Sequence, residues 1–249
     1  MTSVLIIGGG GMIGQKLASS FSTNDSLTLL DIGFPNKNQS NARKIIGSVG
    51  DPEIIENSLK DLPEVIYYLA SVVSGEAEAD FSKGWDVNIH AFWAFLSLVK
   101  KLNEKSQGQY KPKIIFTSSI AVFGSPFPKQ IPDDFIVAPR TSYGAQKASC
   151  ELMLNDFSRK GFCEGLAIRL PTICVRPGKP NLAASSFFSG IIREPLSGIK
   201  AQLPVSTAVR HWHASPRSAV RFLRHAETLN FSQLTFNSGL NMPGLSCTV

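Results

Sequence analysis

The stretch VLIIGGGGMIGQK, from Val4 to Lys16, places four consecutive glycines directly after an apolar run. Glycine loses more backbone freedom on folding than any other residue, so four in a row need a specific reason. The spacing Gly8-x-x-Gly11-x-x-Gly14 falls between an expected strand and an expected helix. Backbone without side chains at that point lets a pyrophosphate approach the amide groups that begin the helix. The stretch therefore predicts a dinucleotide-binding turn.

Two features near this turn narrow the ligand. A phosphate-loop NTPase would have Lys followed by Ser or Thr after the last glycine, whereas Gly14 is followed by Gln15-Lys16-Leu17. Asp31 ends the next apolar run, 17 positions after Gly14. A carboxylate there can accept a hydrogen bond from a ribose 2′-hydroxyl and repels a 2′-phosphate, which favours NAD over NADP. The alternative, in which Asp31 only ends a strand at a turn, stays open.

Apolar runs recur along the chain with helical segments between them, which predicts an α/β fold with a doubly wound parallel sheet of the Rossmann type. Asp51-Pro52 and Ser215-Pro216 each place a capping side chain before a proline and predict helix starts. Past Arg169 the pattern loosens into a segment rich in Pro, Gly and small residues. We expect a dinucleotide-binding domain over 1–170 and a small, partly irregular substrate-binding region over 171–249. The runs are Val4–Ile7, Leu27–Leu30, Lys44–Ile46, Val65–Leu69, Lys113–Phe116 and Leu166–Ile168.

Composition excludes several classes of protein. With 249 residues, 43% of them hydrophobic and 18% charged, the chain is globular and not disordered. The apolar segment Ala91–Leu102 has the length of a buried core helix, and an interfacial membrane helix is the less favoured alternative. We expect a cytoplasmic protein that binds neither a membrane nor, despite a net charge of +6, a nucleic acid, because nucleic-acid-binding motifs are missing. The basic segment Lys100–Lys113 is interpreted as a solvated surface.

Cysteine and histidine spacing does not indicate a metal centre. The four cysteines show no CxxC pair, which predicts free thiols. In the sequence HWH, an extended strand would point His211 and His213 to the same side, but two ligands make an incomplete zinc site. We therefore expect no metal ion.

Serine, tyrosine and lysine residues follow in an order that suggests chemistry. TSSIAVFG spans Thr117 to Gly124, and Tyr143-Gly144-Ala145-Gln146-Lys147 comes next, with tyrosine and lysine four apart on one helix face. Together with the glycine turn and Asp31, this order resembles the extended branch of the short-chain dehydrogenase/reductases, the NAD-dependent epimerase/dehydratase family. The resemblance also covers YYLAS (Tyr67 to Ser71), Val87-Asn88 and RLPT (Arg169 to Thr172). The stretches VVSGEAEADF and RLPTICVRPGKPNLAASSFFSGIIREPL are similar to the D-erythronate dehydrogenase group within that branch, which oxidises a four-carbon sugar acid at C2.

The resemblance implies a role for each matching residue. Tyr143 would be the catalytic acid/base, Lys147 its activating partner and Ser119, four residues before Phe123, the donor to the substrate oxygen. A phenolate poised near neutrality needs its pKa lowered by about three units, for which we expect Lys147 and the cationic nicotinamide together to suffice. The cofactor NAD would be bound by Gly8, Gly11, Met12, Ile13, Gly14, Asp31, Leu69, Ala70, Ser71, Asn88, Tyr143, Lys147, Pro171 and Thr172. The substrate would be bound by Ser74, Ser119, Tyr143, Arg176, Asn181 and Ser185, with Arg176 holding a carboxylate.

The sequence departs from the family pattern at several places. Gly47-Ser48-Val49 stands where an aspartate near the adenine is usual, Ile7 replaces a frequent threonine and Tyr68 replaces the usual histidine. Extended-branch members commonly continue for some tens of residues beyond a motif like Met242-Pro243-Gly244-Leu245, so we expect part of the substrate pocket to require residues beyond Val249.

Other functions remain open. A nucleotide-sugar epimerase or dehydratase would need a diphosphate partner, for which Arg210 is available. A redox-inactive dinucleotide sensor or an RNA-associated scaffold on the same fold is the third possibility, although a binding module has no need of a phenolate. The resemblance also implies a homodimer formed through helices that include the YxxxK helix.

Overall fold

A parallel sheet forms the centre of the molecule. The computed structural model describes residues 2–35, 42–234 and 239–249. Seven strands run in the order β3-β2-β1-β4-β5-β6-β9, and each neighbouring pair is parallel. The order of the chain reverses between β1 and β4, and such a switch point opens the crevice in which these sheets bind ligands. The α/β prediction is thereby confirmed. The strands are β1 (Ser3–Ile7), β2 (Ser26–Asp31), β3 (Arg43–Ile46), β4 (Val65–Tyr68), β5 (Lys113–Ser119), β6 (Glu164–Leu170) and β9 (Leu240–Asn241).

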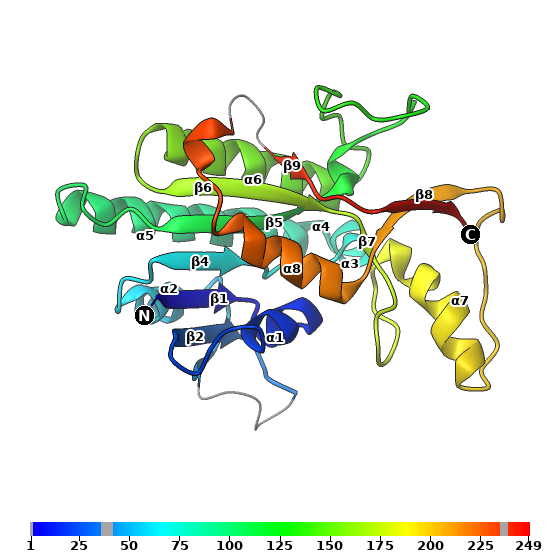
Figure 1. The fold of residues 1–249 in the computed structure, drawn as a ribbon, viewed down its shortest axis with the longest axis horizontal. Helices are drawn as coiled ribbons and strands as arrows, with labels where there is room; N and C mark the ends of the chain where they lie inside the picture. Colours follow the sequence, from blue (N-terminus) through cyan, green and yellow to red (C-terminus); the bar gives the residue numbers. More distant parts are fainter. Residues whose placement is uncertain (1, 36–41, 235–238) are drawn as a thin grey trace.

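Helices cover both faces of this sheet (Figure 1). On one face lie α1 (Met12–Ala18) and α8 (Pro216–Ala226), and on the other lie α2 (Pro52–Leu59), α5 (Ala91–Lys105) and α6 (Ser142–Arg159). Side chains alternate along each strand, so Leu5 and Ile7 pack toward α2, α5 and α6 while Val4 and Ile6 pack toward α1 and α8. Two apolar layers result, and the sheet is buried between them.

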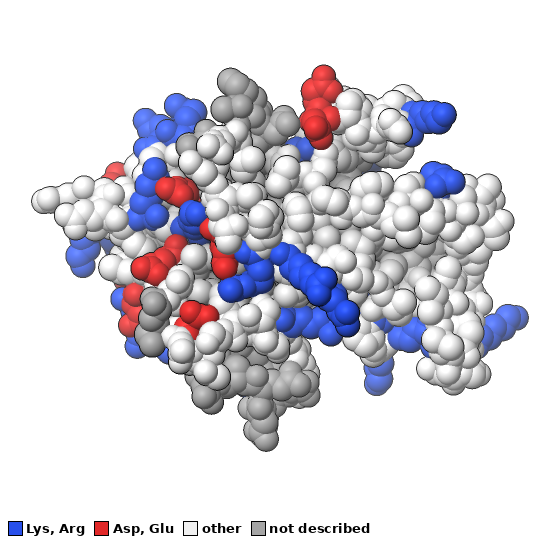
Figure 2. Space-filling view, viewed as in Figure 1, with Lys and Arg blue, Asp and Glu red and all other residues white. Residues whose placement is uncertain are grey.

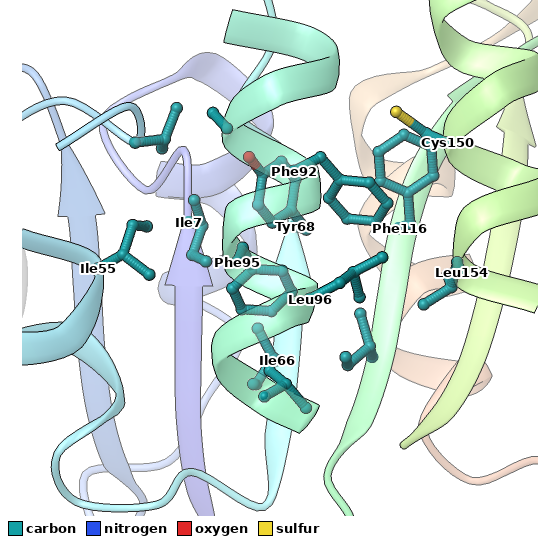
Figure 3. Packing of buried hydrophobic residues seen from close by; sticks show 14 of the residues in the cluster. Ile7, Ile55, Ile66, Tyr68, Phe92, Phe95, Leu96, Phe116, Cys150 and Leu154 are labelled. Atoms are coloured by element: carbon teal, nitrogen blue, oxygen red, sulfur yellow. The ribbon is translucent and has the colours of Figure 1, made fainter. Parts of the chain in front are cut away.

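Aromatic rings fill the layer beneath α5 (Figure 3). The ring of Tyr68 lies 4.8 Å from that of Phe92 and 5.2 Å from that of Phe95, and the rings of Phe92 and Phe116 lie 4.7 Å apart. The segment Ala91–Leu102 is therefore a core helix, as favoured from its length. Among the residues that the structure describes, no helix combines the length and apolar character that crossing a membrane requires.

Both expected helix caps are present. The Asp51 side chain accepts a hydrogen bond from the Glu53 amide at the start of α2, and the Ser215 side chain accepts one from the Ser218 amide at the start of α8. Each satisfies an amide that has no partner within its helix. The two helix starts predicted from the Asp-Pro and Ser-Pro pairs are confirmed.

Smaller elements connect and extend the sheet. A second sheet, in the order β10-β8-β7, lies with α7 to one side of the molecule (Figure 1). The remaining elements are α3 (Ser74–Ala79), α4 (Phe81–Trp85), the π-helical η1 (Asp86–His90), the 3₁₀ segments η2 (Ile120–Val122), η3 (Ala184–Ser186) and η4 (Phe231–Gln233), α7 (Phe187–Leu196), β7 (Thr172–Ile173), β8 (Arg210–Ala214) and β10 (Leu245–Thr248).

The C-terminal part of the chain returns to the main sheet. Leu240 of β9 pairs with Ile168 of β6, and α8 buries Ala219 and Leu223 in the apolar layer that holds Ile6. Two elements of the region 171–249 thus pack on the region 1–170. The division at residue 170 stays a prediction. Within the region 171–249, the elements α8 and β9 pack on the main sheet, whereas β7, β8 and β10 form the second sheet.

Positive side chains gather over the middle of one face. Figure 2 shows Lys and Arg concentrated where Figure 1 places α8, and this helix exposes Arg217 and Arg221. The part of this face around β8 and α7 is mostly uncharged (Figure 2). The net charge of +6 is therefore distributed unevenly: on this face it gathers over α8, which belongs to the expected substrate-binding region 171–249, and not over β8 and α7.

Candidate active site

The glycine turn joins β1 to α1 in a conformation that two of its glycines require. Gly8 has φ +91°, and a Cβ built on it would lie 2.6 Å from the Ala70 amide nitrogen. A Cβ on Gly14 would lie 2.2 Å from the Gly8 carbonyl oxygen. Side chains at these two positions would separate β1, β4 and α1, so both glycines serve the fold.

Gly11 differs from both, because nothing in the protein requires a glycine there. Its φ of −69° and ψ of 166° suit any residue, and a Cβ on it would meet only the Gly8 carbonyl oxygen, at an ordinary 3.4 Å. Gly11 is exposed, and as the N-cap of α1 it leaves the first amides of the helix without a side-chain cap. Bare backbone beside uncapped amides fits a bound pyrophosphate, with Met12 and Ile13 continuing the turn into the helix.

Asp31 lies against this turn. Its Oδ2 accepts a hydrogen bond from the Gly10 amide at 2.8 Å, and a Cβ on Gly10 would lie 3.0 Å from the Asp31 carboxyl carbon. The carboxylate is therefore fixed beside the site expected for a cofactor pyrophosphate. This position supports ribose binding more than the alternative in which Asp31 only ends a strand.

The end of β4 forms the opposite wall. The amides of Leu69 and Ala70 both donate to the Ile7 carbonyl, at 2.8 and 3.1 Å. Asn88 in η1 holds the next residues, because its Oδ1 accepts from the Val72 amide at 2.8 Å and from the Ser71 hydroxyl at 3.0 Å. The Asn88 amide nitrogen also donates to the Gln146 side chain at 2.7 Å. Asn88, expected from the resemblance to contact the cofactor, thus has its side-chain groups engaged within the protein.

Tyr143 and Lys147 project from the first turns of α6. Thr141 caps this helix by accepting a hydrogen bond from the Gly144 amide at 3.0 Å. The Lys147 ammonium is buried, donates to the Thr117 carbonyl at 2.9 Å and lies 5.6 Å from the centre of the Tyr143 ring. The half-buried Tyr143 phenol interacts with the hydroxyls of Ser71 and Ser119. The structure therefore brings Ser119, Tyr143 and Lys147 together.

Burial and hydrogen bonding distinguish the two adjacent serines. The Ser118 side chain is buried and donates to Glu151, whereas Ser119, the last residue of β5, is only partly buried and lies by Tyr143. The Ser118 hydroxyl is thus engaged by Glu151, and Ser119 is the serine beside the phenol. This geometry supports the choice of Ser119 made from its distance to Phe123.

Burial dominates the ionisation of the site. It raises the pKa of Tyr143, while Ser71, the positive charge of Arg176 and Ser119 act in the opposite direction. Burial also lowers the pKa of Lys147 to about 8. The expected lowering of the phenol pKa is therefore absent from the protein alone. The cation that acts on the phenol is Arg176, which sequence reasoning assigned to the substrate carboxylate.

The other expected substrate residues meet between α3 and the segment that follows β7. Arg176 donates from Nη1 to the Asn181 side chain at 3.3 Å, and the Ser74 hydroxyl accepts from the Ala184 amide at 3.0 Å. Ser185 lies next to this contact, in η3. Arg176, Asn181 and Ser74 thus have hydrogen-bond partners here, and Arg176 is the one that also acts on Tyr143.

Pro171 and Thr172 follow β6 directly and are buried. The Thr172 hydroxyl contacts Nε2 of His211 at 2.7 Å, and the rings of His211 and His213 lie 5.2 Å apart on one side of β8, as the HWH pattern predicts. Burial lowers the pKa of His211 to about 4, so this imidazole is neutral at physiological pH. The Thr172 side chain thus has a partner within the protein, and the role of Pro171 and Thr172 at the nicotinamide stays a prediction.

Cysteines and metal-ligating side chains were the other features that the sequence raised. All four cysteines are free thiols, as predicted. Within residues 2–35, 42–234 and 239–249, no three His, Cys, Asp or Glu side chains gather where they could hold a metal ion.

Sequence reasoning missed two groups near the site. Gln146 is fully buried and binds Asn88, and Glu151 is buried in an ion pair with Arg169. The available signal was a polar and a charged side chain inside the YxxxK helix, one residue before Lys147 and four residues after it. A charged residue on an otherwise buried helix face needs a partner.

Comparison with known proteins agrees with this geometry. Residues 4–214 match the NAD dependent epimerase/dehydratase family. The chain is 42% identical to D-erythronate dehydrogenase from Cupriavidus necator and 40% identical to D-erythronate dehydrogenase from Haemophilus influenzae, over 99% of this chain and 78% of each relative. A crystal structure described as the nucleoside-diphosphate-sugar epimerase from Agrobacterium tumefaciens is 46% identical, with a TM-score of 0.89 over 99% of this chain and 75% of that one.

A more distant structure shares the fold alone. The UDP-glucose 4-epimerase of Thermus thermophilus, solved with NAD, superposes with a TM-score of 0.78 at 17% identity, over 98% of this chain and 79% of that one. The protein is an NAD-dependent dehydrogenase by these relationships, and the chain belongs to the NAD-dependent epimerase/dehydratase family.

Proposed function

We propose that this protein oxidises a hydroxyl of a small sugar acid, D-erythronate or a close analogue, at C2, with Tyr143 as the general base and NAD as the hydride acceptor. The observation that carries the proposal is the position of Arg176, whose positive charge acts on the Tyr143 phenol. In a 2-hydroxy acid the carboxylate is bonded to C2. A guanidinium that binds the carboxylate near Tyr143 would therefore bring the adjacent carbon, C2, toward the base. The two D-erythronate dehydrogenases that resemble the chain support the substrate class.

Each residue of the site would have a separate role in the reaction. Ser119 would donate a hydrogen bond to the reacting oxygen, and Tyr143 would take the hydroxyl proton as the carbon gives up its hydride. Bound NAD⁺ would supply the hydride acceptor and a second positive charge near the phenol. Lys147, held by the Thr117 carbonyl, would keep an ammonium next to the Tyr143 ring and hold the nicotinamide ribose. Ser74, Asn181 and Ser185 would bind the remaining substrate oxygens.

The ionisation of Tyr143 requires this arrangement. Burial raises its pKa, and a neutral phenol is a poor base. One nearby cation typically lowers a pKa by about 1–3 units, so Arg176, Lys147 and oxidised cofactor together are enough to form a phenolate near neutrality. A substrate carboxylate would pair with Arg176, and the cofactor charge would then remain as the main counterpart of the phenolate. We therefore expect NAD⁺ to bind before the sugar acid.

The test is NADH formation with a panel of four- and five-carbon aldonates. Native protein should form NADH with D-erythronate, and Tyr143→Phe should lower kcat by roughly 10²–10⁴-fold, the usual contribution of a general base. Tyr110→Phe is the matched control, because the Tyr110 hydroxyl is also buried but donates to the Pro63 carbonyl, at 3.2 Å, outside the site. Activity retained in Tyr143→Phe would refute the mechanism, and absence of NADH with every aldonate would refute the substrate class.

A nucleotide-sugar epimerase is the second candidate, because the structure from Agrobacterium tumefaciens described under that name is 46% identical. Such an enzyme must hold a diphosphate. Arg210, the residue available for it, is exposed on β8 and donates to the Ser246 carbonyl at 3.1 Å. Calorimetric titration with UDP- and dTDP-sugars distinguishes the candidates, since a small-acid dehydrogenase should not bind them. A redox-inactive sensor would bind NAD and form no NADH with any substrate.

We also propose a homodimer that pairs through α5 and α6. Trp93 on α5 is 53% exposed and Leu152 on α6 is 64% exposed, which supports an apolar contact on this face. Sedimentation analysis of the native protein and of Trp93→Glu should give a dimer and a monomer, respectively. A monomeric native protein would exclude the dimer.

A further inference from the structure

A buried ion pair lies directly behind the catalytic residues. Glu151 and Arg169 are 1% and 3% exposed, and Arg169 donates from Nη2 to Oε2 of Glu151 at 2.8 Å and from Nε to Oε1 at 3.0 Å. The Ser118 hydroxyl donates to the same carboxylate. Burying two charges is costly unless they are paired and hydrogen-bonded, so a fully bonded cluster at this position needs a reason.

The cluster continues a set of contacts between β5 and α6. Tyr143, Lys147 and Glu151 are four residues apart and share one face of the helix. Three successive residues of β5 meet them, because Ser119 interacts with Tyr143, the Thr117 carbonyl accepts from Lys147 and Ser118 donates to Glu151. The contact of Ser118 with Glu151 therefore fixes the position of the strand end that carries Ser119.

The charges around Lys147 come from several elements. On α6 the neighbours are Tyr143, Cys150 and Glu151, and on β5 they are the Phe116 ring, 4.6 Å from the ammonium, and the Thr117 carbonyl. Burial lowers the pKa of Lys147 to about 8, and Cys150 and Glu151 act against it.

The two groups that act against this lowering differ, because Glu151 is a carboxylate in an ion pair and Cys150 is a buried thiol. Burial raises the pKa of the Cys150 thiol to about 12, so the thiol is neutral. Arg169, from β6, is bonded to Glu151, and Arg176, from the segment after β7, acts at Tyr143. Glu151 is therefore the negative charge that favours the ammonium form of Lys147.

We propose that Ser118, Glu151 and Arg169 are positioning residues for the reaction: the Glu151 carboxylate, one helical turn from Lys147 and bonded to Ser118 and Arg169, locks the end of β5 against α6, so that Ser119 and Tyr143 share one substrate hydroxyl. This inference rests on the proposed function for its effect on rate. Its effect on Lys147 can be read from cofactor binding alone, because the same ammonium would hold the nicotinamide ribose.

Two variants separate charge from geometry. Glu151→Gln together with Arg169→Met removes both charges at once and so leaves no unpaired charge in the interior. Ser118→Ala keeps the ion pair and removes one hydrogen bond. Ser58→Ala is the matched control, because Ser58 is also buried and its hydroxyl donates to the Ile55 carbonyl within α2, away from the site.

The variants should differ in their pH dependence. In the charge-free double variant, Lys147 should lose its proton at lower pH. The alkaline limbs of the pH profiles of kcat and of NAD⁺ affinity should then move down by about one pH unit, so that both quantities fall roughly tenfold near pH 8. Ser118→Ala should keep the native limbs and lower kcat roughly threefold to tenfold at every pH, with unchanged NAD⁺ affinity, because Ser119 shifts away from Tyr143. The control should match native protein in both.

Calorimetry of NAD⁺ binding and NADH formation, each from about pH 6 to about pH 9, provide the readouts. Native alkaline limbs in the double variant, or native kcat in Ser118→Ala, would overturn the proposal. If the double variant does not fold, the comparison of Ser118→Ala with Ser58→Ala still decides the geometric part. A native protein that binds NAD⁺ with the expected pH dependence but oxidises no sugar acid would refute the proposed function and leave this inference standing.

Discussion

Replacing Gly11 and Gly14 by alanine in turn should separate the cofactor from the fold. At Gly14 a Cβ would lie 2.2 Å from the Gly8 carbonyl oxygen, against 3.4 Å at Gly11, a difference of 1.2 Å in clearance from the same atom. The backbone around Gly14 cannot make room for a Cβ unless α1 moves. Overpacking of this kind costs about 1–3 kcal/mol, and a contact with backbone belongs at the upper end.

The expected thermal effects follow from these contacts. For a chain of this size each kcal/mol lowers Tm by about 2–4 °C, so Gly14→Ala should lose roughly 6–12 °C. Gly11→Ala has an ordinary φ and ψ and no clash, and its smaller cap penalty is offset by the reduced entropy of the unfolded chain. Its Tm should stay within about 4 °C of native protein.

Cofactor affinity should respond to the change at Gly11, which has little effect on the fold. The methyl group of Gly11→Ala would occupy the space beside the uncapped amides of α1, so NAD⁺ should bind at least about tenfold more weakly, a loss of about 1.4 kcal/mol or more. Thermal melts without ligand and calorimetric titration with NAD⁺ measure the two effects. Unchanged NAD⁺ affinity in Gly11→Ala, or a Tm loss equal to that of Gly14→Ala, would refute the assignment of Gly11 to the ligand.

Three further predictions address cofactor choice, substrate binding and pH. Asp31→Ser should weaken NAD⁺ and raise the relative affinity for NADP⁺, measured by titration with both; an unchanged ratio would assign Asp31 to the turn alone. Arg176→Lys should raise KM for the sugar acid about tenfold or more without changing NAD⁺ affinity, since an ammonium cannot bind a carboxylate bidentately; an unchanged KM would contradict this role. His211, whose pKa burial lowers to about 4, binds its proton more readily in the unfolded chain, so stability should fall as pH drops from about 6.5 to about 4. Thermal melts across that range should show a weaker dependence in His211→Asn, and an equal dependence would exclude His211 as its source.

Much of the fold can be predicted from local sequence. Runs such as Val4–Ile7 and Lys113–Phe116 are strands because both faces of the sheet are covered, and the glycine spacing marks the turn between β1 and α1. The strand β9 cannot be predicted in this way. Leu240–Asn241 is a strand only because Ile168 and Arg169 lie beside it, and no pattern within two residues can show that.

The site, like the fold, has features that the sequence predicts and features that it does not. Tyr143 and Lys147 face one side because their spacing matches one helical turn, and the spacing of Ser119 from Phe123 predicts which of the two adjacent serines lies by Tyr143. The ionisation of Tyr143 could not be predicted, because it depends on burial and on Arg176, which comes from a segment whose path the sequence leaves undetermined. The carboxylate of Glu151 escaped notice for a related reason, since its partner Arg169 is on another strand.

The return of the chain to the main sheet has a consequence for how new specificities arise. The segment from β7 to β8 leaves from β6 and re-enters at α8, and both ends are packed on the nucleotide-binding half. Such a segment is attached to the sheet at both ends, so its interior can be exchanged without disturbing Gly11 or Asp31, provided that Arg176, which acts on Tyr143, is kept. Grafting the corresponding stretch from a relative of different specificity, with Arg176 retained, should therefore change which substrate binds and leave the cofactor site in place.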